Sequence, residues 1–126
     1  MAHFTRTLVL LSAFAAFAAE AADVTGTWTA KVPTADGGND YTFAFRQSGA
    51  TLIGTARSDA GVVDLANGSI NRNTIAFVEN VTVAGQRLVI EYTGELVSDN
   101  EIRFKRQAIA PPYFTVQFVA TRTETP

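Results

Sequence analysis

The stretch VTGTWTAKV, residues 24–32, alternates between apolar and polar side chains over most of its length. Trp28, Ala30 and Val32 fall on one face of an extended chain, and the polar residues between them fall on the other. A period of two is the pattern of a β-strand with one face buried and one face in water. The stretch therefore predicts a β-strand whose tryptophan points into a core.

The same alternation recurs along the rest of the chain, with clusters of Gly, Asn, Asp, Ser or Pro between the alternating stretches. No window shows the spacing of an amphipathic helix. The fourth of the predicted strands is the least regular, because Asn67-Gly68 interrupts it. The connections are too short for parallel crossovers, so neighbouring strands should pair antiparallel. We predict eight strands, at residues 24–32, 41–47, 51–57, 62–70, 74–82, 87–95, 101–107 and 113–123.

Eight short strands with one apolar face each either close into a barrel or split into two packed sheets. Closure removes the exposed edges that invite aggregation. The motif Gly26-Thr27-Trp28 favours the barrel, because it resembles the G-x-W signature at the first strand of the calycin superfamily, which includes lipocalins, fatty-acid-binding proteins and avidins. The resemblance implies an all-β protein with one eight-stranded antiparallel up-and-down barrel, closed at one end by Trp28.

In calycins a basic side chain from the last strand lies over this tryptophan. Arg122 ends the last predicted strand and shares the parity of Phe118, so we expect it to reach Trp28. The stretch LIGT, residues 52–55, looks like part of the avidin pattern. Biotin binding is not expected, because avidin pockets are walled by several tryptophans and this chain has one. The chain also resembles small exported bacterial domains of unknown function with the same strand plan.

The N-terminal segment has the features of a secretory signal peptide. Arg6 precedes an apolar run of 12 residues, 8–19, and Ala19-Glu20-Ala21 is a small-x-small cleavage pattern. The alternative is a membrane anchor, but a helix of that length spans only about 18 Å of a hydrocarbon core of about 30 Å. We therefore predict a signal peptide at residues 1–21 and a β-barrel domain at residues 22–126, which is periplasmic or secreted and has no transmembrane segment.

Composition excludes several kinds of chemistry. The chain has no Cys, and its one His, His3, lies in the predicted signal peptide, so disulfides, thiolate chemistry and imidazole ligands are excluded from the mature domain. The net charge is −2, and residues of both signs are interspersed along the chain. We therefore do not expect the chain to bind nucleic acid. We interpret Arg103, Lys105 and Arg106 as a solvated strand face. We expect no cofactor, no metal and no enzymatic activity.

Glu79 continues the inward parity of Ile75 and Phe77. An inward carboxylate would need a donor such as Tyr41, Tyr92 or an arginine at the barrel mouth, because burial of an unpaired charge costs several kcal/mol. The alternative is that the strand twists, or that Glu79 lies at the rim in water. Because of the cost of burial, we favour the second interpretation.

The aromatic residues fall mainly on the predicted inner face, where they either fill the interior or line a pocket. Our first functional hypothesis is an exported barrel that binds a small apolar or amphipathic molecule in its interior. The alternative is a solid interaction module that contacts an envelope protein or a surface glycan through loops such as 34–40 and 110–113. The predicted ligand-binding residues are Trp28, Tyr41, Phe43, Phe45, Phe77, Glu79, Tyr92, Phe104, Phe118 and Arg122.

Overall fold

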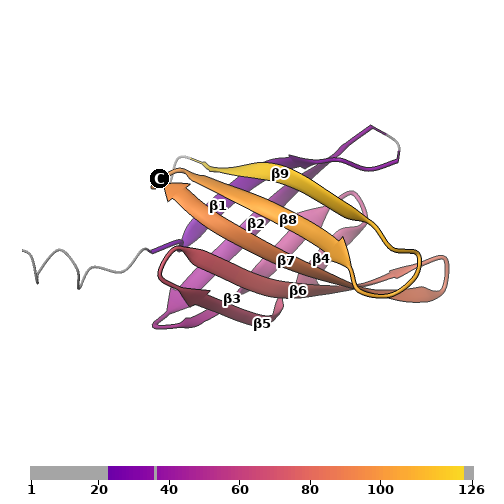
Figure 1. The fold of residues 1–126 in the computed structure, drawn as a ribbon, viewed down its shortest axis with the longest axis horizontal. Helices are drawn as coiled ribbons and strands as arrows, with labels where there is room; N and C mark the ends of the chain where they lie inside the picture. The colour runs from indigo at the N-terminus through magenta and orange to yellow at the C-terminus, as the bar shows by residue number, and fades with distance from the viewer. Residues whose placement is uncertain (1–22, 36, 124–126) are drawn as a thin grey trace, which may run out of the picture.

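The computed structural model describes residues 23–35 and 37–123, which form strands joined by short turns (Figure 1). The predicted signal peptide, residues 1–21, lies outside the described residues. None of the described residues belongs to a helix that is long and apolar enough to cross a membrane. The strands are β1 Gly26–Val32, β2 Asn39–Ser48, β3 Thr51–Ser58, β4 Gly61–Asp64, β5 Ala66–Asn71, β6 Thr74–Val83, β7 Gln86–Ser98, β8 Glu101–Ala108 and β9 Thr115–Arg122.

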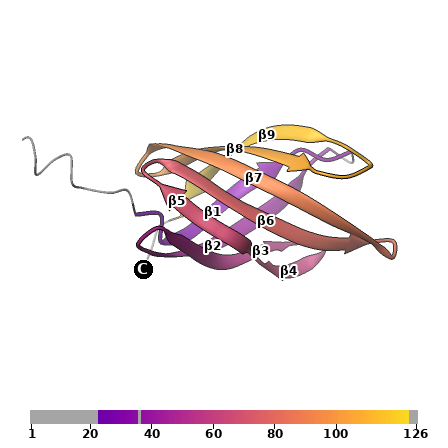
Figure 2. The same cartoon turned by 60° about the horizontal axis from the view of Figure 1, so that its bottom comes forward.

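The sheet closes on itself as an antiparallel barrel (Figures 1 and 2). Consecutive strands pair from β1 to β3 and from β5 to β9, and β9 returns to pair with β1. Both β4 and β5 pair with β3, and only Leu65 separates them, so together they occupy one position in the barrel. The predicted eight-stranded antiparallel barrel is therefore confirmed.

The irregular fourth strand is where the sequence suggested a break. The pairing of β5 with β6 shifts register between Ala66 and Ser69, and Asn67 has a positive φ of 53°. Gly68 lies so close to β3 that a Cβ added there would stand 2.0 Å from the carbonyl oxygen of Leu52. Asn67-Gly68 thus forms a bulge, which lets the backbone pass closer to its neighbour than any side chain would allow.

The inner face follows the predicted parity. The nine predicted site residues other than Arg122 are all buried, and the Phe and Tyr rings among them meet inside the barrel. The ring of Phe43 is fully buried in the middle, with six aromatic centroids between 5.7 and 6.3 Å from its own. Side chains therefore fill the centre of the barrel, which was one of the two predicted interiors. The six neighbours are Tyr41, Phe45, Phe77, Tyr92, Phe104 and Phe118.

The last strand begins later than predicted. The sequence placed it at residues 113–123 with Phe114 inside, whereas β9 begins at Thr115 and Phe114 is half-buried in the loop before it. Tyr113 is 72% exposed. Pro111-Pro112 explains the late start, because neither proline can donate to a ladder and the chain needs further residues to reach the sheet.

Candidate functional site

Trp28 closes the end of the barrel at which β1 begins and β9 ends; Figure 1 shows these two strand ends side by side. The indole is fully buried and its Nε1 donates to the carbonyl oxygen of Val24 at 3.0 Å. The guanidinium carbon of Arg122 lies 4.5 Å from the centre of the ring. The contact expected between Arg122 and Trp28 is therefore present, and the two residues are also direct partners across the β1–β9 pairing.

Arg122 ties two backbone segments to the end of β9 above the indole. Its Nε donates to the carbonyl oxygen of Asp99 at 2.9 Å, Nη1 to that of Thr25 at 2.7 Å, and Nη2 to that of Asp23 at 3.0 Å. A Cβ on Gly26 would stand 3.0 Å from Nη1, and the φ of +141° at Gly26 disfavours any other residue. Arg122 thus joins the β7–β8 turn to the segment before β1, and all three of its nitrogens have backbone acceptors.

The opposite end of the barrel, here called the mouth, contains a cluster of buried polar side chains. Tyr92 on β7 and Arg106 on β8 are direct cross-strand partners. Glu79 on β6 is one inward position from Phe77, which pairs with Tyr92, so it lies diagonally across from that tyrosine. Tyr41 reaches the cluster from β2. The period of two therefore brings four polar side chains from four strands to one end of the aromatic core.

The hydrogen bonds of the cluster have a defined direction. Arg106 can only donate, and its Nε donates to the Tyr92 hydroxyl at 2.8 Å. The Tyr92 hydroxyl then donates its single hydrogen to Oε1 of Glu79 at 2.7 Å. Nη2 of Arg106 stands 3.8 Å from the same carboxylate oxygen and donates to the Tyr41 hydroxyl at 3.3 Å. The chain of donors ends on Glu79, as it would for an ionised carboxylate.

Aromatic rings surround the guanidinium of Arg106. Its central carbon lies 5.6 Å from the ring centre of Tyr41, 5.7 Å from that of Tyr92 and 5.2 Å from that of Phe114. Rings at such distances attract a cation and restrict its movement. Arg106 is therefore held in place by π-faces as well as by hydrogen bonds.

Two predictions about this end were wrong. Glu79 is 2% exposed and fully buried, whereas the favoured expectation placed it at the rim or on a twisted strand. Burial is tolerated because Tyr92 donates to the carboxylate and Arg106 lies beside it, which are two of the donors that the sequence suggested. Arg106 was grouped with Arg103 and Lys105 on a solvated face, yet it is 9% exposed and points inward.

The sequence contained an indication that Arg106 points into the barrel. Ile102 and Phe104 were assigned inward, and Arg106 continues their parity along the same strand. The prediction placed Arg106 in solvent because its side chain is charged, although the alternation of the strand placed it inside. In the structure the register holds to the end of β8, because Tyr92 and Tyr41 supply the polar partners that a buried arginine requires.

Burial alters the acid–base properties of the cluster. It raises the pKa of Tyr92 far above its ordinary range, and the negative charge of Glu79 adds to the effect. Burial alone would lower the pKa of Arg106, but the surrounding Tyr92, Tyr41 and Glu79 oxygens outweigh it and raise that pKa. Tyr92 therefore stays protonated and Arg106 stays charged at any physiological pH. The cluster can donate hydrogen bonds and present positive potential, and neither group is poised to exchange a proton.

A cavity of about 340 Å³ opens onto this cluster. The β1–β9 pairing ends at Ala30 and Ala120, although β9 starts five residues earlier and β1 continues to Val32. Pro33 follows Val32 and has no backbone N–H with which to extend the ladder. The two strands therefore separate toward the mouth, and the cavity lies between them. Its lining, largely apolar, consists of Pro33, Thr34, Ala35, Arg106, Phe114 and Val116.

Arg106 is the charged group of this cavity, here called the mouth cavity. Among the described residues its Nη1 has no hydrogen-bond partner, and the side chain is 11% exposed on the cavity side. The Tyr41 hydroxyl accepts from Arg106 and keeps its own hydrogen to donate. Thr34 also lines the cavity, with a buried Oγ1 that has no hydrogen-bond partner within the described part of the chain.

The structure divides the predicted site residues into three groups. Tyr41, Glu79 and Tyr92 come together with Arg106 beneath the mouth cavity. Trp28 and Arg122 form the closure at the far end. The other predicted residues, which are Phe43, Phe45, Phe77, Phe104 and Phe118, pack against one another between the two ends.

No group of three or more His, Cys, Asp or Glu side chains that could hold a metal ion occurs among the described residues. Comparison with protein-family models, with curated proteins and with solved structures found no match to this chain.

Proposed function

We propose that the chain is an exported binding protein, without enzymatic activity, that holds a small amphipathic molecule in the mouth cavity. The observation that carries the proposal is that a largely apolar cavity of about 340 Å³ ends on a buried arginine with unused N–H donors. Binding sites for small molecules combine an apolar wall with a few well-placed polar groups. The apolar part of the ligand contacts Phe114 and Val116, and its polar part reaches Arg106.

The filled interior restricts the ligand to this end of the barrel. Phe43 and its aromatic neighbours occupy the centre, and Trp28 closes the other end. A ligand in the mouth cavity needs no displacement of these rings. The separation of β1 from β9 leaves a route to it.

The binding group is also preorganised. Arg106 is fixed by Tyr92, Tyr41 and three aromatic rings before any ligand arrives. An arginine that is already ordered loses little conformational entropy when a ligand accepts its hydrogen bond. This favours a binding role over a purely structural one for the donors that face the cavity.

Native mass spectrometry of the protein purified from its own source tests the proposal. We expect a bound small molecule in the wild type, none in Ala35→Trp, where an indole fills the cavity, and an unchanged amount in Ala110→Trp. Ala110 is exposed and lies outside the lining, so it controls for an added indole in a loop. Sequencing of the N-terminus of the same sample tests cleavage after Ala21. A ligand retained by Ala35→Trp would place it elsewhere.

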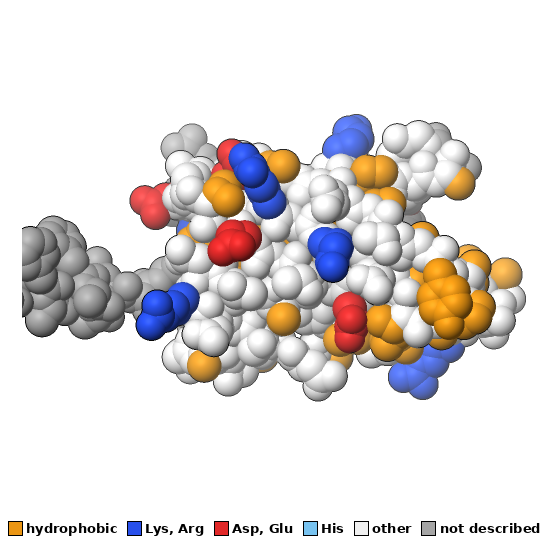
Figure 3. Space-filling view, in the orientation of Figure 1, with side chains coloured by type: hydrophobic (Ala, Val, Ile, Leu, Met, Phe, Trp, Pro, Cys, Tyr) orange, Lys and Arg blue, Asp and Glu red, His pale blue; other side chains and the backbone are white. Residues whose placement is uncertain are grey.

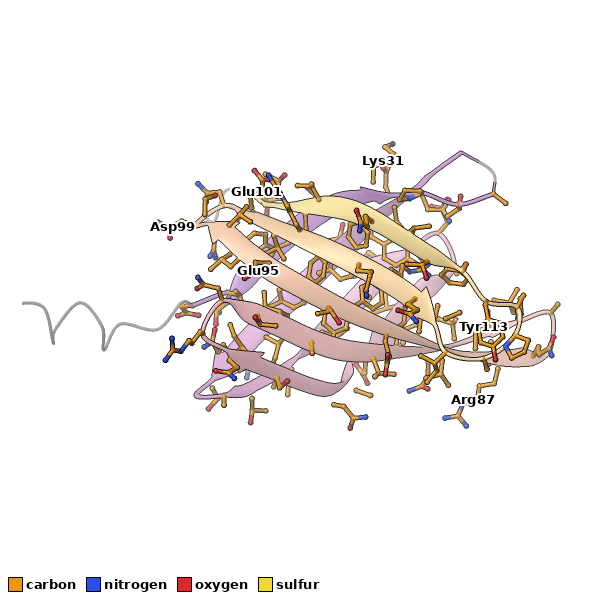
Figure 4. The ribbon with its side chains drawn as sticks, viewed as in Figure 1. Lys31, Arg87, Glu95, Asp99, Glu101 and Tyr113 are labelled. Atoms are coloured by element: carbon orange, nitrogen blue, oxygen red, sulfur yellow. The ribbon has the colours of Figure 1, made fainter. Side chains whose placement is uncertain are left out.

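A second function is supported by the exposed apolar side chains around the mouth. Figure 3 shows hydrophobic atoms gathered at this end, where Figure 4 places Tyr113 on the β8–β9 loop. We call Val83, Ile109 and Tyr113, which are 55%, 45% and 72% exposed, the apolar rim. An exposed aromatic on a loop of a rigid scaffold is a common anchor for a protein partner. The second candidate is therefore a module that docks on another envelope protein.

A pull-down from the source organism with wild-type protein and Tyr113→Ala tests this candidate. Loss of a stoichiometric partner in Tyr113→Ala would support it, and Val97→Ala, which truncates a residue that is 44% exposed at the opposite end, should retain that partner. Equal recovery with both variants would exclude the apolar rim as the docking surface.

A further inference from the structure

Resting on the proposed function, we infer that the mouth cavity selects a ligand whose head group is an uncharged hydrogen-bond acceptor, such as an amide, ester or ketone oxygen, and disfavours a carboxylate. The selectivity follows from Glu79, which already supplies the one negative charge that balances Arg106. The class of ligand is therefore a neutral amphipathic molecule rather than a fatty acid anion.

The polar groups that face the mouth cavity determine what kind of atom can bind there. Arg106 lines the cavity and can only donate, and the hydroxyl of Thr34, which also lines it, can donate as well as accept. Glu79 does not line the cavity, accepts from Tyr92 and is almost completely buried. A head group that binds at Arg106 must consequently accept hydrogen bonds, and an ammonium would stand against a guanidinium of the same charge.

The balance of charge at this site favours a neutral carbonyl acceptor over an anionic carboxylate. Arg106 and Glu79 carry opposite charges 3.8 Å apart in a site enclosed by aromatic rings, so the buried cluster is neutral before a ligand binds. A carboxylate bound to Arg106 would leave this site with a net negative charge, because Glu79 and the ligand would share one cation. Burying a charge without its own partner is costly, whereas a carbonyl oxygen accepts the same hydrogen bonds without that cost.

The charged pair beside the β1–β2 loop does not change the balance. Lys31 and Asp40 flank the β1–β2 loop, and their side chains contact each other at 2.8 Å. Both side chains are largely in water, where their field is screened. Arg106 therefore has no second cation in this pair that could balance an incoming carboxylate.

Titration of the isotope-labelled mature protein with three ligands of eight carbon atoms each tests the inference. Octanamide, octanoate and octylammonium at pH 7 offer a neutral acceptor, an anionic acceptor and a cationic donor. Binding is followed by NMR shifts of the Arg106 Nε–H and of the Thr34 and Val116 amides. We expect octanamide to bind at least about tenfold more tightly than octanoate, and octylammonium to bind most weakly.

Glu79→Gln should reverse the preference. Glutamine keeps an oxygen that can accept from Tyr92, but it removes the charge that balances Arg106. Octanoate should then bind more tightly than octanamide. Glu91→Gln is the matched control, because it removes one negative charge from an exposed position of β7 beside Ile90, the pairing partner of Glu79, and should leave the wild-type preference unchanged.

Failure of the inference is distinguishable from failure of the proposed function. Tighter binding of octanoate by the wild type, with shifts at the mouth, would overturn the inference and leave a ligand site in place. An absence of shifts at the mouth with all three ligands would overturn both. The wild-type comparison does not depend on whether Glu79→Gln folds, and a folded Glu79→Gln that still prefers octanamide would show that Glu79 does not set the selectivity.

Discussion

Each end of this barrel carries one arginine next to aromatic rings, and the two arginines differ in what remains of their hydrogen-bonding capacity. Arg122 directs all three of its nitrogens to backbone carbonyl oxygens of segments that it joins. Arg106 directs Nε and Nη2 to side-chain hydroxyls, leaves Nη1 without a hydrogen-bond partner among the described residues, and lines a cavity. An arginine whose nitrogens all donate to backbone carbonyls holds chain segments together, whereas an arginine with a donor left over can bind a ligand.

The partners of the two arginines also differ in charge. No carboxylate oxygen of the described residues lies within salt-bridge distance of Arg122, whose acceptors are neutral carbonyls near the surface. Arg106 is buried with Glu79, and neither side chain could be buried alone without a large penalty. Stability at the closed end should therefore depend mainly on the packing of Trp28, and stability at the mouth on the pairing of Arg106 with Glu79.

The largest effect is expected for Trp28→Ala. Truncating a fully buried indole should lower the free energy of unfolding by about 3–5 kcal/mol, because it leaves a cavity and removes the surface on which Arg122 lies. Urea unfolding followed by circular dichroism measures the change, since the variant has no other tryptophan to report it. A loss no larger than that of an exposed substitution would mean that the closed end contributes little to stability.

Arg106→Leu should lower the free energy of unfolding by about 3 kcal/mol, because it leaves Glu79 as an unpaired buried charge. Combining it with Glu79→Leu should recover most of the loss, since the unpaired charge is then gone. A double-mutant cycle in urea measures the coupling. Additive losses would show that the two side chains do not act as a pair.

A smaller loss, about 1–2 kcal/mol, is expected for Arg122→Leu. Its carbonyl acceptors lie near the surface and can bond to water when the guanidinium is removed, so no buried charge is left unpaired. The same urea experiment, compared with Arg106→Leu, tests whether the mouth depends on charge more than the closed end does. A larger loss for Arg122→Leu would reverse that ranking.

Alkaline pH should lower the free energy of unfolding through Tyr92, which lies at the mouth. The pKa of Tyr92 is raised in the folded protein above its ordinary value of 10.0, so above that pH the unfolded chain loses a proton that the folded chain keeps. The stability that protonated Tyr92 provides is complete below pH 10.0 and is lost as the pH rises further.

Thermal unfolding between pH 8 and pH 11.5, with tyrosinate absorbance recorded in parallel, measures this dependence. The wild type should lose stability more steeply above pH 10.0 than Tyr92→Phe does. Tyr113→Phe, at an exposed position, is the control and should follow the wild type. Parallel curves for the wild type and Tyr92→Phe would contradict the assignment of the effect to Tyr92.

The smallest effect on stability is expected for Tyr113→Ala in the apolar rim. The side chain is 72% exposed, so its loss should change the free energy of unfolding by no more than about 0.5 kcal/mol. Urea unfolding checks this value. A larger destabilisation would mean that Tyr113 supports the β8–β9 loop, and any loss of a partner in the pull-down would then need a second rim variant, Ile109→Ala.

Periodicity predicted much of the fold and part of the candidate site. Alternation along β1, β2, β6 and β7 placed Trp28, Phe43, Phe77 and Tyr92 inside, because successive side chains of a strand must point to opposite faces. The same rule applied to Arg106, but residue type was weighted above parity there. Phe114 was placed inside the last strand, whereas β9 begins at Thr115, the residue after it.

Local sequence was sufficient to predict an all-β chain, the alternation that defines its inner face and the break at Asn67-Gly68, since these depend on neighbours a few residues away. Closure of the barrel brings Tyr41 to Arg106, which is 65 residues further along the chain, and places Glu79 where it accepts a hydrogen bond from Tyr92 and its charge is balanced by Arg106. Closure of the barrel sets which strands face each other across its axis. Whether a buried charge finds its partner depends on that closure and not on local sequence.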